Sequence, residues 1–442
     1  MIKEYESYQP IKSSVYKEAP INWKKYRVKD TVDKNTYYPV GDGDHGSIKP
    51  EMYQKEGIPY IRVQNLTWHG DILTDGIVCI SEEVQFANKK SILYPGDILI
   101  AKTGATIGKL GLIPESIKEA NTTSSVGKLT VDKKWFSPKY ILYCFQSRAL
   151  QDQIWLEASQ KSAQPGFNID DLIVFEFLAP DLDGQLKVVE YLDHQTAIID
   201  QLILQKEKLI ELLKEKRQAV INEAVTKGLN PNAKMKDSGI EWLREVPEHW
   251  EISKVKWHLE FCNSRRIPIE AAERYNRKGE YPYYGASGII DYVDDFLFEG
   301  EFILVGEDGA NILSRSSPLA FIATGKFWVN NHAHILKVTD GEIQYFSEQL
   351  ELNDFSTIAS GSAQPKLTKE ALGNLRIIVP NIQEQKSIVE FITNSNNLID
   401  TTIVKINSQI EKLKEYRQSI ISEAVTGKID VRDWQPNKKQ MV

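Results

Sequence analysis

Residues 213–226 read LKEKRQAVINEAVT, and residues 413–426 read LKEYRQSIISEAVT. Ten of these fourteen positions are identical at an offset of 200 residues. The same offset relates Ser-Ala-Gln-Pro at residues 162–165 to Ser-Ala-Gln-Pro at residues 362–365, and Pro180 to Pro380. Self-similarity at one fixed spacing indicates an internal duplication. The chain is therefore expected to contain two copies of one structural plan.

Both copies carry apolar residues at steps of three and four positions, which is the heptad pattern of a coiled-coil helix. The first seam contains Ile199, Ile203, Ile210, Leu213 and Val220, and the second contains Ile399, Ile403, Ile406, Ile410, Leu413 and Ile420. Lys206 and Arg217 interrupt the first seam and are expected to face the columns of Ile406 and Arg417. Each helix packing on its own domain is the alternative. Helices of more than about 25 residues are uncommon in globular domains, so packing of the two helices on each other is favoured.

Length and composition set further limits. A chain of 442 residues is too long for one core and should form at least two domains. It has no apolar run of eighteen residues and a polar N-terminus, so neither a membrane span nor a secretory signal is expected, and the cytoplasm is predicted. Cys79, Cys144 and Cys262 are widely spaced and are expected to be buried thiols in a reducing compartment. The net charge of −7 disfavours a simple nucleic-acid binder, although local patches matter more than the total.

Five segments follow from the pattern. Residues 1–181 form a globular segment with strands at 59–63, 76–80 and 97–101, and residues 182–227 form the first long helix. Residues 228–381 contain a linker at 228–239 and a second globular segment with strands at 302–305 and 334–338. Residues 382–428 form the second helix, and the polar tail at 429–442 is expected to fray. The helices repeat while the globular segments differ, which suggests one scaffold holding two different recognition surfaces.

Catalytic motifs are not found. Gly104 and Gly108 resemble a phosphate-binding loop, but three residues separate them where four are needed, and Leu110 replaces the required Ser or Thr. The chain has no nucleophile elbow and no glycine-rich cofactor loop. His332 and His334 are spaced to share one strand face, yet no cysteine or histidine cluster accompanies them, so a hydrogen-bonded entry to a strand is favoured over a metal site. No catalytic residue and no metal site is predicted.

Basic residues recur in short clusters. They are Lys24, Lys25, Arg27, Lys29, Lys89, Lys90, Lys102, Lys109, Arg265, Arg266, Arg274, Arg277 and Lys278. A solvated surface explains any one of these clusters taken alone. Several together are also what a protein needs to neutralise phosphates.

Several motifs together resemble the specificity subunit of type I restriction-modification enzymes. They are KDSGIEW at 236–242, VPEHWE at 246–251, the doubled EAVT helices, YGASG at 284–288, EDGA at 307–310 and NNHAH at 330–334. IPYIRV at 58–63 and GDILIAK at 96–102 are similar to the first target-recognition domain of that family. The resemblance covers nearly the whole chain.

The resemblance implies an α+β fold with a pseudo-two-fold duplication. Two β-rich target-recognition domains would each read one half of a bipartite sequence in double-stranded DNA. The two long helices would pack as an antiparallel coiled coil, separate the domains and carry two methyltransferase (modification) subunits, which restriction/translocase subunits would join. This chain would be non-catalytic and bind no cofactor, while S-adenosylmethionine, ATP and Mg²⁺ would act on the partner subunits.

Candidate DNA-binding residues are placed at turns and basic positions. They are Lys102, Thr103, Gly104 and Lys109 in the first globular segment, and Arg265, Arg266, Ser287, Asn330, Asn331 and His332 in the second. Basic residues would hold phosphates and polar loop residues would read base edges. A duplicated coiled-coil adaptor without DNA contact is the main alternative. An autonomous nuclease or methyltransferase is a third, and it lacks the motif it would need.

Overall fold

The computed structural model describes residues 3–160, 165–361 and 365–436. By its contacts the chain divides into two compact units. Unit 1 comprises Met1–Lys206 and Ser408–Val442, and unit 2 comprises Glu207–Asn407. Each long helix therefore contributes one part to each unit. Most of the repeated Ser-Ala-Gln-Pro, at residues 162–164 and 362–364, lies outside the described residues.

The long helices are α5 (Leu182–Lys227) and α11 (Ile382–Val425). Their first turns are capped alike, because the side chains of Asp181 and Asn381 each accept a 3.0 Å hydrogen bond from the main-chain N–H three residues later. Their ends are also alike. Gly228 and Gly427 follow with φ values of 74° and 70°, the left-handed conformation that ends many helices.

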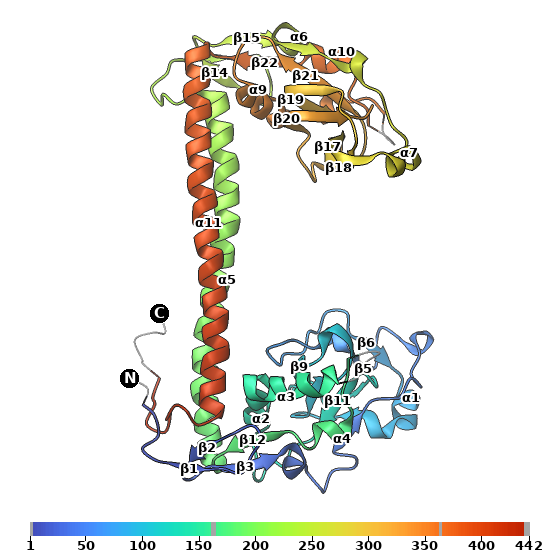
Figure 1. Ribbon diagram of the computed structural model, residues 1–442, viewed down its shortest axis with the longest axis vertical. Coiled ribbons are helices and arrows are strands. Elements are labelled where there is room, and N and C mark those ends of the chain that lie inside the picture. The colour runs from blue at the N-terminus through green and yellow to red at the C-terminus, as the bar shows by residue number, and fades with distance from the viewer. Residues whose placement is uncertain (1–2, 161–164, 362–364, 437–442) are drawn as a thin grey trace. The chain divides into compact units, whose positions relative to one another are not determined.

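The helices pack antiparallel within each unit (Figure 1). In unit 1, Arg417 Nε donates to Asp200 Oδ1 at 2.9 Å, and Lys206 Nζ donates to Gln409 Oε1 at 2.6 Å, so numbers rise along α5 as they fall along α11. In unit 2, Arg217 pairs with Asp400, which repeats the first pair at the offset of 200. Lys206 and Arg217 were expected to face Ile406 and Arg417. This prediction is wrong, because in the antiparallel register Lys206 meets Gln409 and Arg217 meets Asp400.

Burial along the helices follows the apolar seam. The buried seam residues are Ile199, Ile399, Ile406, Ile410 and Ile420, and the half-buried ones are Ile203, Ile210, Leu213, Val220, Ile403 and Leu413. Ile199 and Ile420 belong to the core of unit 1, against which Ile203 and Leu413 also pack. The predicted fold class, α+β with two β-rich bodies and two long antiparallel helices, is confirmed.

The two duplicated ion pairs differ in exposure, which gives a first prediction. The side chain of Arg417 is 10% exposed and that of Arg217 is 32% exposed. We expect Arg417→Ala to lower the free energy of unfolding of unit 1 by about 1–2 kcal/mol, because the guanidinium that donates these charged hydrogen bonds is largely buried. Arg217→Ala should cost unit 2 less than about 1 kcal/mol, as exposed pairs do. Hydrogen exchange in each unit measures both losses, and equal losses would contradict the prediction.

The body of unit 1 is rich in short strands. Its elements are β1 (Tyr8–Pro10), β2 (Glu18–Pro20), β3 (Lys24–Arg27), β4 (Val40–Asp42), β5 (Ile58–Ile61), β6 (Val78–Ile80), α1 (Glu82–Ala87), β7 (Ile92–Leu93), β8 (Ile98–Ala101), β9 (Leu110–Leu112), β10 (Ala120–Thr122), β11 (Val126–Leu129), α2 (Pro138–Gln146), α3 (Arg148–Ser159), α4 (Ile169–Leu172) and β12 (Glu176–Ala179). Two four-stranded sheets have the orders β4-β11-β8-β9 and β6-β5-β10-β7.

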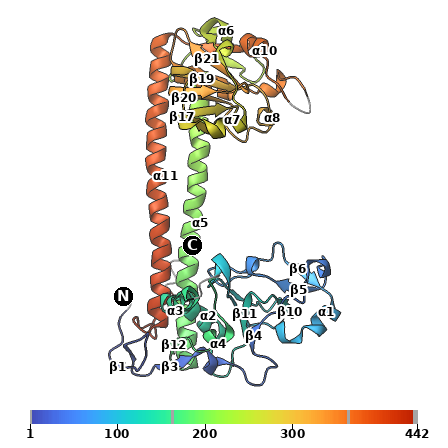
Figure 2. The same ribbon diagram turned by 45° about the vertical axis from the view of Figure 1, so that its right-hand side comes forward.

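The body of unit 2 is built around one six-stranded sheet with the order β16-β21-β19-β20-β17-β18 (Figure 2). Its elements are β13 (Met235–Asp237), β14 (Glu245–Pro247), β15 (Glu251–Lys254), α6 (Val255–His258), β16 (Leu259–Phe261), α7 (Ala271–Asn276), β17 (Lys278–Gly285), β18 (Gly288–Val293), β19 (Phe298–Gly306), α8 (Asn311–Ser314), β20 (Ala320–Val329), β21 (Ala333–Val338), α9 (Ile343–Leu352), α10 (Lys369–Asn374) and β22 (Arg376–Val379). The predicted strands near residues 59, 77, 98, 303 and 335 correspond to β5, β6, β8, β19 and β21.

The two bodies share one strand plan despite their different sequences. The order β4-β11-β8-β9 in unit 1 matches β16-β21-β19-β20 in unit 2. β5 runs parallel to β10 and antiparallel to β6, as β17 runs parallel to β20 and antiparallel to β18. The one long strand β20, which pairs with both β19 and β17, therefore takes the places of β9 and β10. The duplication therefore includes the globular bodies, where the sequence shows almost none of it.

A buried tyrosine ties each body to its long helices. In unit 1, Tyr140 Oη of α2 donates to Leu178 O at 2.8 Å and to Val425 O at 3.4 Å. In unit 2, Tyr345 Oη of α9 donates to the carbonyl oxygens of Ile378 at 3.1 Å and Val225 at 3.3 Å. Both tyrosines are 0% exposed. Each thus joins a body strand to the last turn of a long helix.

Two sequence expectations about irregular segments are corrected. Residues 228–239, read as a linker, contain β13, which pairs antiparallel with β14. The tail after α11 does not fray over its described part, residues 428–436. Asp430 bridges Lys3 in the N-terminal arm, and the Trp434 ring lies 5.2 Å from that of Tyr191.

None of the described helices is long and apolar enough to cross a membrane.

Candidate nucleic-acid interface

A short loop, residues 330–332, connects β20 to β21 in unit 2. Its main chain is fixed at several points, because Asn330 Oδ1 accepts from His332 N at 2.8 Å and His332 O accepts from Glu307 N at 2.8 Å. Asn330 is buried, whereas the side chains of Asn331 and His332 are exposed. The loop therefore presents two polar side chains from a rigid backbone, which suits direct readout of base edges.

The turn between β17 and β18 lies beside this loop. Asn330 N donates to Tyr284 O at 3.0 Å, and Ser287, three residues after Tyr284, is exposed at the turn. His332 Nδ1 lies 2.8 Å from Asp308 Oδ1 in the segment after β19. The structure thus gathers the predicted Ser287, Asn330, Asn331 and His332 around one surface.

Arg266 acts inside unit 2 and anchors this surface. Its Nη1 donates to Glu307 Oε2 at 2.6 Å, to Ala333 O at 2.8 Å and to Asn331 O at 3.2 Å. The two side chains are only 16% and 12% exposed. Arg265 is also engaged, because its Nη2 donates to Leu297 O at 2.9 Å. Of the two arginines predicted as DNA contacts, Arg266 is held by a carboxylate within the unit, whereas Arg265 is exposed and pairs with no carboxylate in the described part of the chain.

The charge of Glu307 is supported from several sides. Burial alone would raise the pKa of this carboxyl, but the hydrogen bond from Arg266 and the neighbouring His334, Arg266 and Lys366 lower the pKa below its usual value. His334 is 1% exposed and sits between Asn263 Nδ2 at 2.8 Å and Leu367 O at 2.7 Å. Burial lowers the pKa of His334 and favours its neutral form.

Among the described residues no cluster of three potential metal ligands occurs. His334 is a core histidine whose two ring nitrogens both have hydrogen-bond partners.

In unit 1 the predicted residues Lys102, Thr103 and Gly104 follow β8, as Glu307 follows β19. Lys102 is 6% exposed and forms an ion pair with Asp42. Thr103 bridges Gly166, and Gly104 N donates to Pro165 O at 3.2 Å with a φ of 76°. Gly309 N makes the same bond to Pro365 O in unit 2. Thr103 and Gly104 therefore stabilise a corner of the body through their main chain, and the side chain of Lys102 is held by Asp42.

The sequence analysis missed the unit 1 counterpart of loop 330–332. Lys102 N donates to Ser125 O at 2.9 Å, just as Glu307 N donates to His332 O, so residues 123–125 correspond to residues 330–332. These residues are Thr123, Ser124 and Ser125, all half-buried. A polar run immediately before a strand, Thr-Thr-Ser-Ser here and Asn-Asn-His there, was the available signal.

The family model for the type I restriction modification DNA specificity domain matches residues 20–213 and 247–412. The chain belongs to this family. The MjaVIII specificity subunit of Methanocaldococcus jannaschii is 26% identical over 444 aligned residues, covering 94% of this chain and 95% of the relative. A putative type I specificity subunit of Haemophilus influenzae is 34% identical over 148 residues, covering 32% of this chain and 37% of the relative.

Solved structures agree with this fold. The specificity subunit of Thermoanaerobacter tengcongensis covers 94% of this chain with a TM-score of 0.53 at 15% identity, and this chain covers 99% of it. A chain from work on complex assembly and conformational transition of the type I R-M system reaches a TM-score of 0.67 at 14% identity, covering 93% of this chain and 100% of that one. With the match to the family model, the chain is a type I DNA specificity subunit.

Some lysines of this specificity subunit remain available for DNA phosphates. Lys89 Nζ lies 3.6 Å from the centre of the Phe86 ring, and Lys90 Nζ lies 5.3 Å from that of Tyr38. Neither lysine, nor the half-buried Lys109, has an acidic partner within 4.0 Å in the described part of the chain. Unlike Lys102 and Arg266, these three lysines are not held by a carboxylate and can meet a negatively charged backbone.

Proposed function

We propose that the body of each unit reads one half of a bipartite target in double-stranded DNA. The observation that carries this proposal is the pair of corresponding loops, residues 123–125 and 330–332, which sit at the same place in one shared strand plan but carry different polar side chains. Two frameworks of the same topology with different polar side chains support two different half-sites. Asn331 is suited to adenine, because its amide both donates and accepts a hydrogen bond.

The long helices would carry the partners. Their outward faces keep large apolar side chains in water: Leu204, Leu209, Leu212, Leu398 and Val404 are between 44% and 70% exposed. Exposed apolar surface of this kind marks interaction sites. We assign it to two methyltransferase (modification) subunits, with restriction/translocase subunits joining them. S-adenosylmethionine, ATP and Mg²⁺ would then be used by those partners.

Mapping of methylated adenines at base resolution tests this function. A host carrying this chain with its methyltransferase should show a bipartite motif that disappears when the chain is deleted. Asn331→Ala should lower methylation efficiency about 5- to 150-fold at sites with the original second half, because one bidentate base contact contributes about 1–3 kcal/mol. Ser124→Ala should affect only the first half.

Asn374→Ala provides the matched control, since Asn374 is an exposed asparagine on α10 of the same unit. It should leave the methylated motif unchanged. A methylome that is unchanged by deletion of the chain, with the methyltransferase shown to be active, would favour the coiled-coil adaptor instead.

A further inference from the structure

Unit 1 closes an aromatic site on its long helices with its own tail. Trp434 lies edge-on to Tyr191 of α5, with ring centres 5.2 Å apart and planes at 80°, and 5.3 Å from the His194 ring. Tyr191 is 0% exposed and belongs to the core of unit 1, against which Trp434 packs. The tail is held upstream by Arg432, which pairs with Asp430 at 2.6 Å and lies 5.0 Å from the Tyr5 ring.

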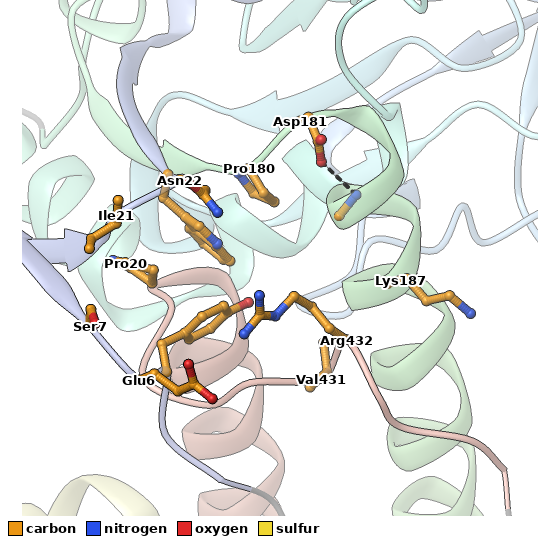
Figure 3. A pocket seen from close by; sticks show the side chains of 13 residues that line it. Glu6, Ser7, Pro20, Ile21, Asn22, Pro180, Asp181, Lys187, Val431 and Arg432 are labelled. Atoms are coloured by element: carbon orange, nitrogen blue, oxygen red, sulfur yellow. Dashed lines mark hydrogen bonds between the residues drawn. The ribbon is translucent and has the colours of Figure 1, made fainter.

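Figure 3 shows where this tail is seated. Val431 and Arg432 lie near Glu6 and Ser7 of the N-terminal arm, around a cavity of about 370 Å³ at the start of α5. Asp430 bridges Lys3 of the arm, so the tail runs beside the arm before Trp434 reaches Tyr191.

Unit 2 has a corresponding site on its long helices, but no tryptophan of the described chain packs on it. The residue 200 positions after Tyr191 is Phe391, and Phe391 is 43% exposed. Phe391 lines a groove of about 870 Å³ together with Val220, Ala224, Leu229, Met235 and Leu243. The residue that corresponds to Trp434 is Lys234, which is exposed. Thus one copy of the aromatic site is closed within the chain and the other is open.

The path of the chain explains the difference. After α11 the tail continues across α5 as far as Trp434, whereas after α5 the chain turns into β13 at Met235 and pairs with β14. The groove in unit 2 therefore has no segment of its own to fill it among the described residues. Its rim is polar, with Glu223, Lys227, Arg244 and Glu245.

We propose that the groove around Phe391 is a docking slot for a tryptophan side chain of the modification subunit, which rests on the docking proposed above. The duplicate in unit 1 gives the chemistry of the occupant, since an indole packs edge-on to the corresponding ring there. A tryptophan in an apolar groove with a polar rim is the usual composition of a binding hot spot. A second copy of this chain is a poorer occupant, because its Trp434 is already seated on its own Tyr191.

Binding of purified modification subunit to the full-length chain is the first test. Phe391→Ala should weaken binding about 10- to 100-fold, as loss of a hot-spot contact does. Trp257→Ala is the matched control, because Trp257 is an aromatic residue in the body of unit 2 that is 69% exposed, and it should leave the affinity unchanged. Failure of the unaltered chain to bind would instead refute the docking function itself. Equal affinity of the Phe391→Ala variant and the unaltered chain would overturn only the slot.

Crosslinking identifies the occupant. A photoreactive benzoylphenylalanine at position 391 should crosslink, after irradiation of the assembled complex, to a peptide of the modification subunit that contains a tryptophan. Mass spectrometry reads the site. Crosslinks to a segment without tryptophan, crosslinks to a second copy of this chain, or none above the level of the same probe at position 257 would each overturn the assignment.

Discussion

Arg266→Ala should lower the free energy of unfolding of unit 2 by about 2–4 kcal/mol, toward the range found when one partner of a buried ion pair is removed. The variant leaves the Glu307 carboxylate, 12% exposed, without its 2.6 Å partner. It also removes the donor to the carbonyl oxygens of Asn331 and Ala333. Denaturant unfolding, with hydrogen exchange of the β19 and β21 amides as the local probe, measures the loss.

Two further variants separate this effect from a general loss of positive charge. Lys278→Ala removes a cation whose side chain is 56% exposed, and it should cost less than about 1 kcal/mol. Arg266→Ala combined with Glu307→Ala should recover most of the loss, since neither member of the pair is then stranded. A single variant no less stable than Lys278→Ala would show that Arg266 does not anchor loop 330–332.

The helices were predictable because their signal is local and repeated. An apolar seam at three- and four-residue steps predicts a helix wherever it lies, and the offset of 200 pairs its two copies without any structural input. The cap residues Asp181 and Asn381 and the terminal glycines obey the same short-range rules. The antiparallel direction was implied by the family resemblance, and the register was not predictable, because Arg417 and Asp200 are 217 positions apart.

The recognition surface was predicted less well, for a physical reason. Whether a lysine or arginine is free depends on acidic partners far away in sequence, such as Asp42, 60 positions from Lys102, and Glu307, 41 positions from Arg266. No composition pattern predicts such pairs. Loop 123–125 became recognisable only through main-chain hydrogen bonds that the two bodies share. The corresponding tyrosines Tyr140 and Tyr345 were missed because their spacing, 205 residues, departs from the repeat of 200.

Those tyrosines are expected to have large and unequal effects. Tyr140→Ala should destabilise unit 1 by about 3–5 kcal/mol, because it leaves a cavity where a fully buried aromatic ring stood. Tyr140→Phe keeps the ring and should still cost about 1–3 kcal/mol, since the carbonyl oxygens of Leu178 and Val425 lose their donor. Burial raises the pKa of Tyr140 well above its ordinary value, so the hydroxyl remains a donor at neutral pH.

Tyr345→Phe in unit 2 is the matched comparison, and its loss should be smaller than that of Tyr140→Phe. Gln349, four residues after Tyr345, also donates to Val225 O, at 3.4 Å, and so supports the end of α5 when the hydroxyl is removed. The residue four positions after Tyr140 is Cys144, whose thiol is only a weak donor. Hydrogen exchange at the ends of α5 and α11 measures the difference. Equal losses in the two units would mean that Gln349 does not compensate for the missing hydroxyl. Negligible losses in both units would mean that the tyrosines act through their rings alone, and that the hydrogen bonds to the helix ends contribute little to holding each body on its helices.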